Sequence, residues 1–151
     1  SSANGRRVLN LKDFITGPRQ TALAGTELMS AVLVPKSSER SISSFLKLGS
    51  RKYLVISISM VAVVLEPGSD DSIENISISV GSCSAVACRL HDLEAELKGR
   101  QLRQMSRLPH ATKFFAPLAP IDDIRSSGQY RLEATAELVR RAILLCVDTL
   151  K

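Results

Sequence analysis

The chain has 151 residues, 44% of them hydrophobic, which is enough for one domain with a real core but short for a two-domain enzyme. Charged residues make up 23%, which argues against wholesale disorder, and the absence of Trp requires a core of Leu, Ile, Val and Ala. The net charge of +5 comes from scattered pairs such as Arg6-Arg7 and Arg140-Arg141. Because no basic stretch is interleaved with aromatic residues, we expect no nucleic-acid partner.

The cysteines and histidines indicate no metal site. Cys83, Cys88 and Cys146 have neither a CxxC nor any other metal-ligand spacing, and His91 and His110 have no ligand-like companion. A sparse, odd set of thiols suggests a reducing compartment, so we expect a cytoplasmic protein with its cysteines packed as small apolar groups. The most apolar run is too short to span a bilayer, and the opening residues lack the apolar segment of a secretory signal.

The first forty residues predict strands joined by loops. A turn at Asn4-Gly5 precedes residues 6–11, which alternate weakly and indicate a strand. Because such a strand would lack a preceding partner, we expect the chain to begin inside a larger unit. Residues 13–24 are typical of a loop, and the β-branched residues of 27–34 predict a second strand that a proline ends. The polar segment 36–40 is the predicted connection to the second part of the chain.

From residue 41 the pattern is that of a sheet. Within residues 42–48, one face of a possible strand has Phe45 and Lys47, and the other has Ile42, Ser44, Leu46 and Leu48. The run 53–65 is apolar on both faces and fits a central strand or a short helical turn leading into one. After a turn at 66–71, isoleucine and valine alternate with serine over 76–80. This alternation predicts a half-buried strand that pairs with the preceding run as a hairpin.

The second half predicts helices. Apolar spacing over 87–97 indicates a helix closed by Gly99, and a shorter helix within 100–115 would be limited by Pro109. Ser126 with Gln129 has the form of a capping box before a long final helix. Strands followed by helices predict an α+β fold with helices on one face of an antiparallel sheet. The buried face of the final helix is expected to contain Leu132, Ala136, Val139, Ile143, Cys146 and Leu150.

Catalytic motifs are scarce, and neither GxGxxG nor a Walker A motif is present. The small residues 81–85 would let a phosphate approach a helix N-terminus, or let a strand turn tightly into a helix, and we favour the second interpretation. The side chains of Asp122 and Asp123 diverge on most backbones, so they are expected to cap a helix or form ion pairs with Arg125 or Arg131. From these residues alone, the chain is not a self-sufficient enzyme.

Several short sequence blocks follow one another across nearly the whole chain. They are Leu11-x-Asp13-Phe14-x-x-Gly17-Pro18-Arg19-x-Thr21, Glu27-Leu28 with Pro35, Phe45-Leu46-Lys47-Leu48-Gly49-Ser50-Arg51, Ile56-Ser57, Val80-Gly81-Ser82, Arg89 with Glu94-x-x-Leu97-x-Gly99, and Pro120-Ile121-Asp122-Asp123-x-Arg125-x-Ser127-x-x-Tyr130-Arg131 running into Arg140-Arg141. Each block is weak alone. In this order and spacing, they resemble the FAD-binding (medium) subunit of the molybdenum hydroxylase family, which includes xanthine dehydrogenase and carbon monoxide dehydrogenase.

The resemblance implies a domain organisation. Such subunits have an N-terminal FAD domain and a C-terminal domain in which a small antiparallel sheet packs against a helical bundle. Residues 1–35 would then be a remnant of the end of the FAD-binding domain, and residues 41–151 the flavoprotein C-terminal domain. The Gly-rich loops that cradle the FAD pyrophosphate would precede Ser1, so we do not expect the chain to be active alone.

The resemblance also implies cofactor-binding residues. Met29 and Lys47 match positions that contact FAD in relatives, and residues 49–55 match a loop beside the flavin ring, where Arg51 is a second candidate cation. A fixed cation near the ring favours flavin reduction, because reduced flavin tends toward an anion. The alternative for Lys47 is a solvated charge on a strand face. The xanthine-oxidising branch has acidic residues where this chain has Tyr53-Leu54-Val55, which argues against inferring NAD as electron acceptor from that branch.

The implied function is electron transfer. A molybdenum cofactor on a large subunit would oxidise the substrate, iron–sulfur clusters on a small subunit would carry the electrons, and FAD would pass them to an external acceptor. The expected partners are those two subunits and the remaining FAD domain. One alternative is a structural or subunit-docking module that no longer binds flavin. A nucleic-acid-binding domain is a further alternative that rests on the basic pI alone.

Overall fold

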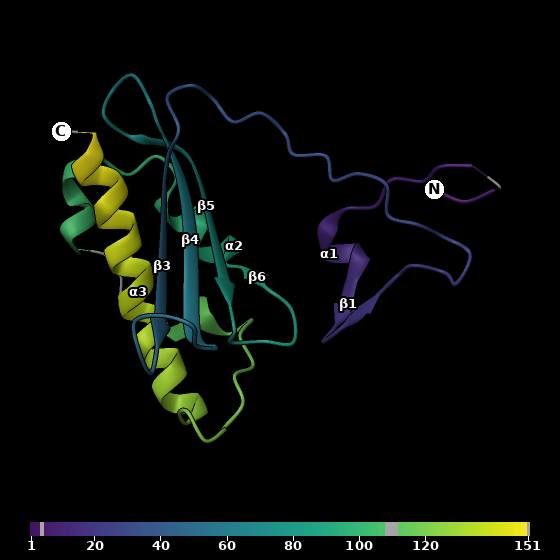
Figure 1. Ribbon diagram of the computed structural model, residues 1–151. Coiled ribbons are helices and arrows are strands. Elements are labelled where there is room, and N and C mark those ends of the chain that lie inside the picture. The colour runs from purple at the N-terminus through teal and green to yellow at the C-terminus, as the bar shows by residue number, and fades with distance from the viewer. Residues whose placement is uncertain (4, 108–111, 151) are drawn as a thin grey trace. The chain divides into compact units, whose positions relative to one another are not determined.

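The chain divides into two compact units, Ser1–Ser37 and Ser38–Lys151. The structure is a computed structural model that describes residues 1–3, 5–107 and 112–150 (Figure 1). In the first unit, a short helix α1 (Leu11–Phe14) leads into an antiparallel hairpin of β1 (Ile15–Gly17) and β2 (Gln20–Thr21). Among the described residues of this unit, only Gly17 is buried. The unit therefore has no hydrophobic core of its own.

Polar contacts hold the first unit in place of a core. The Arg7 side chain donates to both carboxylate oxygens of Glu27 at 2.7 and 2.6 Å and to the Ala22 carbonyl at 2.6 Å. The same carboxylate accepts from the Ala24 N–H at 2.8 Å. These contacts tie the segment after the hairpin to the segment before it.

Both strands predicted in the first unit are absent. Residues 6–10 and 27–34 form no strand, whereas the predicted loop 13–24 contains the end of α1 and the β1–β2 hairpin. A strand is stable only when a neighbour pairs with its backbone groups, and no neighbouring strand pairs with either segment in this unit. The expected turn at Asn4-Gly5 includes Asn4, which lies outside the described residues.

A four-stranded antiparallel sheet forms the centre of the second unit. Its strands are β3 (Ile42–Gly49), β4 (Ser57–Pro67), β5 (Ile73–Gly81) and β6 (Cys88–Arg89), arranged in that order. The sequence predicted the alternation of β3, the central strand within 53–65 and its hairpin with the strand at 76–80, and all three are confirmed. Of the two interpretations of the apolar run, the central strand is correct.

The strand register sorts the side chains onto two faces. Three rows point inward, Ile42–Leu65–Ile76, Ser44–Val63–Ile78 and Leu46–Val61–Val80, and their β4 and β5 members are buried. The alternate rows point outward. They are Ser43–Val64–Ser77, Phe45–Ala62–Ser79 and Lys47–Met60–Gly81.

Helices cover the inner face. The long helix α3 (Gly128–Thr149) lies along β3 and β4, and it begins at the end of the sheet where the chain passes from β3 to β4 (Figure 1). The shorter elements are α2 (His91–Leu97), which packs on β5, and the 3-10 helices η1 (Leu102–Arg107) and η2 (Thr112–Phe115). The predicted α+β fold is confirmed: small antiparallel sheets combined with helices.

The predicted helix ends differ from those observed. The helix expected over 87–97 begins only at His91, because the preceding residues extend the sheet as β6, and Gly99 follows it with a φ of 80° as expected for a C-terminal glycine. The cap of α3 is Ser127 rather than Ser126, and its Oγ accepts from the Tyr130 N–H at 3.2 Å. Pro109 and His110 lie outside the described residues.

Candidate functional site

Lys47 lies on the outward face of β3, near the end of the sheet. Its Nζ donates to the carbonyl of Val55 at 2.7 Å. Arg51 makes a similar contact, since its Nη2 donates to the carbonyl of Leu54 at 2.6 Å. Both cations therefore hold the loop 50–56, which connects β3 to β4. Of these two predicted site residues, Lys47 lies on β3 and Arg51 in the loop, and each donates to a loop carbonyl.

The loop carries exposed and strained residues. Leu54 is 92% exposed and has a φ of 50°, a left-handed conformation that leucine seldom adopts. Lys52 lies over the ring of the exposed Tyr53, with Nζ 5.2 Å from the ring centroid. Gly49 fits at the base of the loop because a Cβ there would lie 2.5 Å from Val55 Cγ1. An exposed leucine in a strained conformation is a feature often found at functional positions.

The cations of this loop differ from others in the unit. Arg40, Arg89 and Arg131 each form an ion pair with a carboxylate. Within the described part of the chain, neither Lys47 nor Arg51 has such a partner. Residues 41–65 contain no Asp or Glu. This end of the outer face therefore carries uncompensated positive charge.

Beside these cations the outer face of the sheet has an apolar strip, formed by β4 and Phe45 and flanked by serines of β3 and β5. Phe45 and Val64 are exposed and Met60 is partly exposed, on neighbouring strands. Met60 lies across Gly81, where a Cβ would come within 2.4 Å of the Met60 Cε. The result is an open apolar surface with Lys47 at its rim, a combination that suits a planar apolar ring bearing negative charge at one edge.

The start of α3 is not available to a phosphate group. The Ser127 Oγ already accepts from the Tyr130 N–H, and Asp122 Oδ1 accepts from the Gly128 N–H at 2.5 Å. Residues 81–85 offer no alternative, because Ser82 turns the chain with a φ of 66° and no helix begins there. Both interpretations of that segment were therefore wrong. A surface with apolar side chains and a cation has the chemistry that the ring portion of FAD requires, whereas the start of α3 offers no phosphate cradle.

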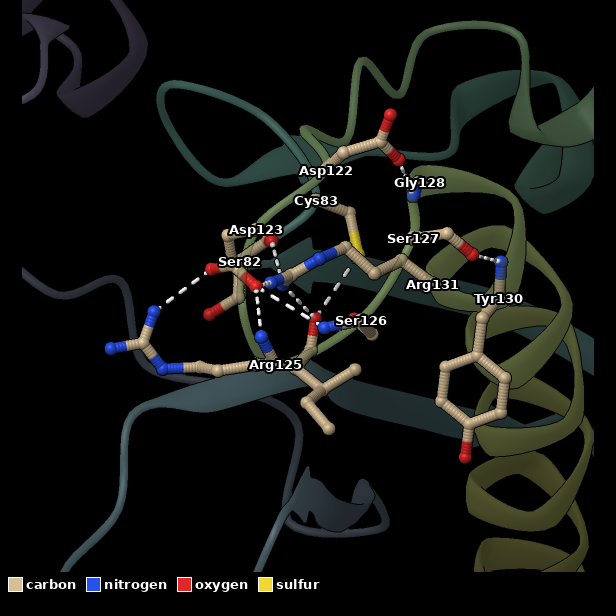
Figure 2. A network of polar contacts seen from close by, with 11 residues as sticks. Ser82, Cys83, Asp122, Asp123, Arg125, Ser126, Ser127, Gly128, Tyr130 and Arg131 are labelled. Atoms are coloured by element: carbon tan, nitrogen blue, oxygen red, sulfur yellow. Dashed lines mark hydrogen bonds and ion pairs between the residues drawn. The ribbon is translucent and has the colours of Figure 1, made fainter.

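A polar network fixes the end of the sheet from its inner side (Figure 2). The Arg131 side chain is 3% exposed, and its Nη2 lies 2.8 Å from Asp123 Oδ1. Its Nη1 donates to the carbonyl of Ile58 at 2.7 Å and to that of Ser82 at 3.4 Å. Asp123 also accepts from the Arg125 backbone N–H and from its guanidinium, both at 2.8 Å. The predicted ion pairs of Asp123 with Arg125 and Arg131 are both present.

These contacts keep Asp123 ionised. The backbone N–H of Arg125 lowers the pKa of the carboxyl most, and the two guanidinium groups lower it further. Burial acts in the opposite direction but is outweighed. Asp123 is therefore a fixed negative charge against Arg131 over the whole physiological pH range.

Buried hydroxyl groups continue the network into the core. Thr135 Oγ1 donates to the Arg131 carbonyl at 2.6 Å, lies 2.7 Å from Ser59 Oγ and lies 3.2 Å from Cys83 Sγ. Cys83 is fully buried, as predicted. The buried roles of Thr135 and Ser59 were missed, because apolar periodicity carries no signal for polar residues.

Met29 belongs to the first unit, where it is 55% exposed. Its predicted contact with FAD stays a prediction. Among the described residues, no helix combines the length and apolar character needed to cross a membrane.

The fold and the motif order place the second unit among the C-terminal domains of flavoprotein subunits. Residues 44–146 match the sequence family described as the CO dehydrogenase flavoprotein C-terminal domain. The chain belongs to this family, and it corresponds to the C-terminal part of the FAD-binding medium subunits.

Two curated relatives extend the similarity to the first unit. The chain is 30% identical over 144 residues to the nicotine 6-hydroxylase medium subunit of Paenarthrobacter nicotinovorans, covering 95% of this chain and 49% of that one. It is 25% identical over 140 residues to the carbon monoxide dehydrogenase medium chain of Hydrogenophaga pseudoflava, covering 93% and 48%. The chain thus spans about half the length of these relatives.

Solved structures show the same fold at lower identity. CO dehydrogenase from Oligotropha carboxidovorans matches with a TM-score of 0.85 at 22% identity, over 97% of this chain and 50% of that one. Quinoline 2-oxidoreductase from Pseudomonas putida 86 matches with a TM-score of 0.83 at 21% identity, over 98% and 50%.

Proposed function

We propose that this chain forms one wall of the FAD site in the medium subunit of a molybdenum-dependent oxidoreductase. The subunit passes electrons from iron–sulfur clusters through FAD to an external acceptor. The observation that carries the proposal is Lys47, a cation without an ion pair among the described residues, at the rim of an apolar sheet face in a member of a flavoprotein family. The medium-subunit names of its relatives support the same role.

The two units have different parts in this proposal. Residues 1–35 are the end of the FAD-binding domain, and residues 41–151 are the flavoprotein C-terminal domain. The lack of a core in the described part of the first unit supports this division, since such a segment needs further chain to complete it. The partners are the remaining FAD domain, a large subunit with the molybdenum cofactor and a small iron–sulfur subunit. We place the assembly in the cytoplasm, in line with three free cysteines.

When bound, FAD supplies the redox chemistry, accepting electrons and passing them on. Lys47 holds positive charge at the rim of the apolar face, where it favours the more negative, reduced form of the ring. Arg51 adds a second positive charge and fixes the loop through the Leu54 carbonyl. Met29, in the first unit, remains a separate candidate that matches a FAD-contacting position by resemblance. Because the loop 50–56 contains no carboxylate, we do not assign NAD as the acceptor.

Flavin binding tests the role of Lys47. In the medium subunit that contains this chain, Lys47→Ala should weaken FAD binding about tenfold, the value of one charge-assisted contact. Lys98→Ala is the matched control, because Lys98 also makes one hydrogen bond, to Asn75 Oδ1 at 3.1 Å, but lies outside the site. Fluorescence titration with FAD gives both affinities. Equal affinities for the two variants would remove Lys47 from the site.

A structural module without flavin is the second candidate. The capped start of α3, which leaves no phosphate cradle there, favours it. The visible absorption spectrum of the purified medium subunit distinguishes the two. A yellow subunit with flavin bands supports the flavin site, whereas a subunit that stays colourless after incubation with FAD supports the structural module. For the isolated chain, a colourless result excludes autonomous flavin binding only.

A further inference from the structure

We propose that Arg131, held by Asp123, is a positioning residue for the flavin site and sets the place of the loop that Lys47 contacts. The inference rests on the proposed function, and it adds to that function a residue on the opposite, buried side of the sheet. Arg131 and Lys47 bind different backbone carbonyls, those of Ile58 and Val55, and the short chain segment between these two residues connects them.

Arg131 completes the backbone hydrogen bonds where the sheet ends. The pairing of β4 with β5 stops at Met60 opposite Gly81. The carbonyls of Ile58 and Ser82 lie beyond that last pair, where β4 is paired only with β3, and the Ile58 carbonyl also accepts from Cys83 Sγ at 3.8 Å. Arg131 Nη1 donates to both of them, at 2.7 and 3.4 Å. Because a buried carbonyl without a partner is costly, this one guanidinium fixes the neighbouring ends of β4 and β5.

The loop leaves the sheet directly from this anchored point. Ile58 is three residues after Val55, whose carbonyl accepts the hydrogen bond from Lys47 at 2.7 Å. On the other side of the loop, the Val55 side chain meets Gly49 at the end of β3. Arg131 therefore fixes the start of β4 at Ile58, and Lys47 fixes the end of the loop at Val55. Movement of Ile58 would shift the Val55 carbonyl and with it the Lys47 ammonium group.

The geometry of Arg131 is itself held by Asp123. The carboxylate accepts from the backbone N–H groups of Arg125 and Ser126 at 2.8 and 3.2 Å. These two bonds orient the carboxylate independently of Arg131. A buried ion pair contributes little net stability compared with apolar residues of the same size. What this pair supplies is a defined direction for its hydrogen bonds, since a guanidinium presents its donors in a rigid plane.

A second ion pair in the same unit provides a matched control. Glu94, on α2, accepts from Arg89 Nε at 2.6 Å and from the Ile78 N–H at 2.7 Å. Burial raises the pKa of Glu94, but these hydrogen bonds and that from His91 outweigh it, so its pKa lies below the usual value. This pair joins α2 to β5 and β6 and has no contact with the loop 50–56. It resembles the Arg131 pair in chemistry and differs from it in position.

The test is a double-mutant cycle on the medium subunit that contains this chain. Arg131→Met should weaken FAD binding about tenfold, and combining it with Lys47→Met should weaken binding no further than Lys47→Met alone, within about twofold. Glu94→Gln should lower thermal stability but leave FAD affinity unchanged. Independent, multiplicative effects of Arg131→Met and Lys47→Met would overturn the proposal. So would an equal loss of affinity in the Glu94→Gln control.

A flavin-free measurement keeps the two proposals apart. In subunit stripped of FAD, hydrogen exchange of residues 50–56 should be at least about tenfold faster in Asp123→Asn than in wild type, with residues 91–97 unchanged. Asp123→Asn preserves the shape of the side chain, so this variant can still be measured if Arg131→Met does not fold. Unchanged exchange in the loop would refute positioning by Arg131. If exchange in the loop is faster but Lys47→Met leaves the FAD affinity unchanged, Arg131 positions the loop and the proposed flavin role of Lys47 is refuted.

Discussion

The two units of the chain are stabilised by different interactions. Ser38–Lys151 has a core of aliphatic side chains between a sheet and a helix, whereas among the described residues of Ser1–Ser37 only Gly17 is buried. The first unit relies on the contacts of Arg7 with Glu27 instead. A solvent-accessible ion pair contributes little compared with buried apolar surface. The contrast teaches that similar apolar content can give a fold in one segment and an exposed chain in another.

Truncating one leucine in each unit gives the largest expected difference. Leu65 is 0% exposed in the core, and Leu65→Ala should lower the free energy of unfolding by about 3 kcal/mol. Leu33 is 74% exposed, and Leu33→Ala should change it by less than about 0.5 kcal/mol. Urea denaturation followed by far-UV circular dichroism measures both. A loss at Leu33 comparable to that at Leu65 would contradict the absence of a core in the first unit.

The buried hydroxyl of Thr135 gives the next largest effect. Thr135→Val keeps the side-chain shape but removes the contacts with Ser59, Cys83 and the Arg131 carbonyl. We expect the free energy of unfolding to fall by about 1.5 kcal/mol, because the polar partners stay buried without the Thr135 hydroxyl. Thr149 makes a comparable bond to the Leu145 carbonyl at an exposed position, so Thr149→Val is the control and should cost less than about 0.5 kcal/mol. The same denaturation experiment compares them.

Removal of residues 1–37 should have a smaller effect. The second unit contains all of the core, so residues 38–151 should retain the fold. We expect Tm to change by less than about 4 °C, which corresponds to under about 1 kcal/mol. Differential scanning calorimetry checks this. A truncated chain that loses its cooperative transition would show that the first unit does stabilise the second.

Acid should affect the first unit locally. The side chain of Arg7 and the Ala24 N–H lower the pKa of Glu27 to about 2, from a usual 4.5. A lowered pKa in the folded state means that the stabilisation is complete above pH 4.5 and is lost as the pH falls through 2. NMR titration of the Ala24 amide should show its shift moving in that window. A midpoint near 4.5 would indicate that the Arg7 contact does not persist in solution.

The contrast also explains which parts of the fold could be predicted from the sequence. The alternation of Phe45 and Lys47 with inward residues, and the hairpin of β4 with β5, were predicted because burial selects apolar residues at every second position. The same rule failed for residues 27–34, whose apolar and β-branched residues are exposed. Periodicity reports the capacity to be buried, and a partner surface decides whether burial occurs.

The site was predictable only in part. Lys47 and Arg51 came from the ordered sequence blocks, and the structure places both against the loop 50–56. The buried face of α3 was expected to begin at Leu132, whereas the residues fully covered in its first turns are Arg131 and Thr135. Their burial depends on carbonyl and hydroxyl groups distant in sequence, which hydrophobic spacing does not report.

The bonds from Arg131 to Ile58 and Ser82 have a consequence for the order of folding. Arg131 follows Ile58 by 73 residues and Ser82 by 49, so these contacts close long loops. A ribosome completes all three long strands before it adds α3, and until then the inner face of β3 and β4 lacks the helix that covers it. Contacts at such separation slow folding and leave apolar surface open to aggregation. The end of the sheet that carries Lys47 can therefore reach its final form only after synthesis has passed residue 131.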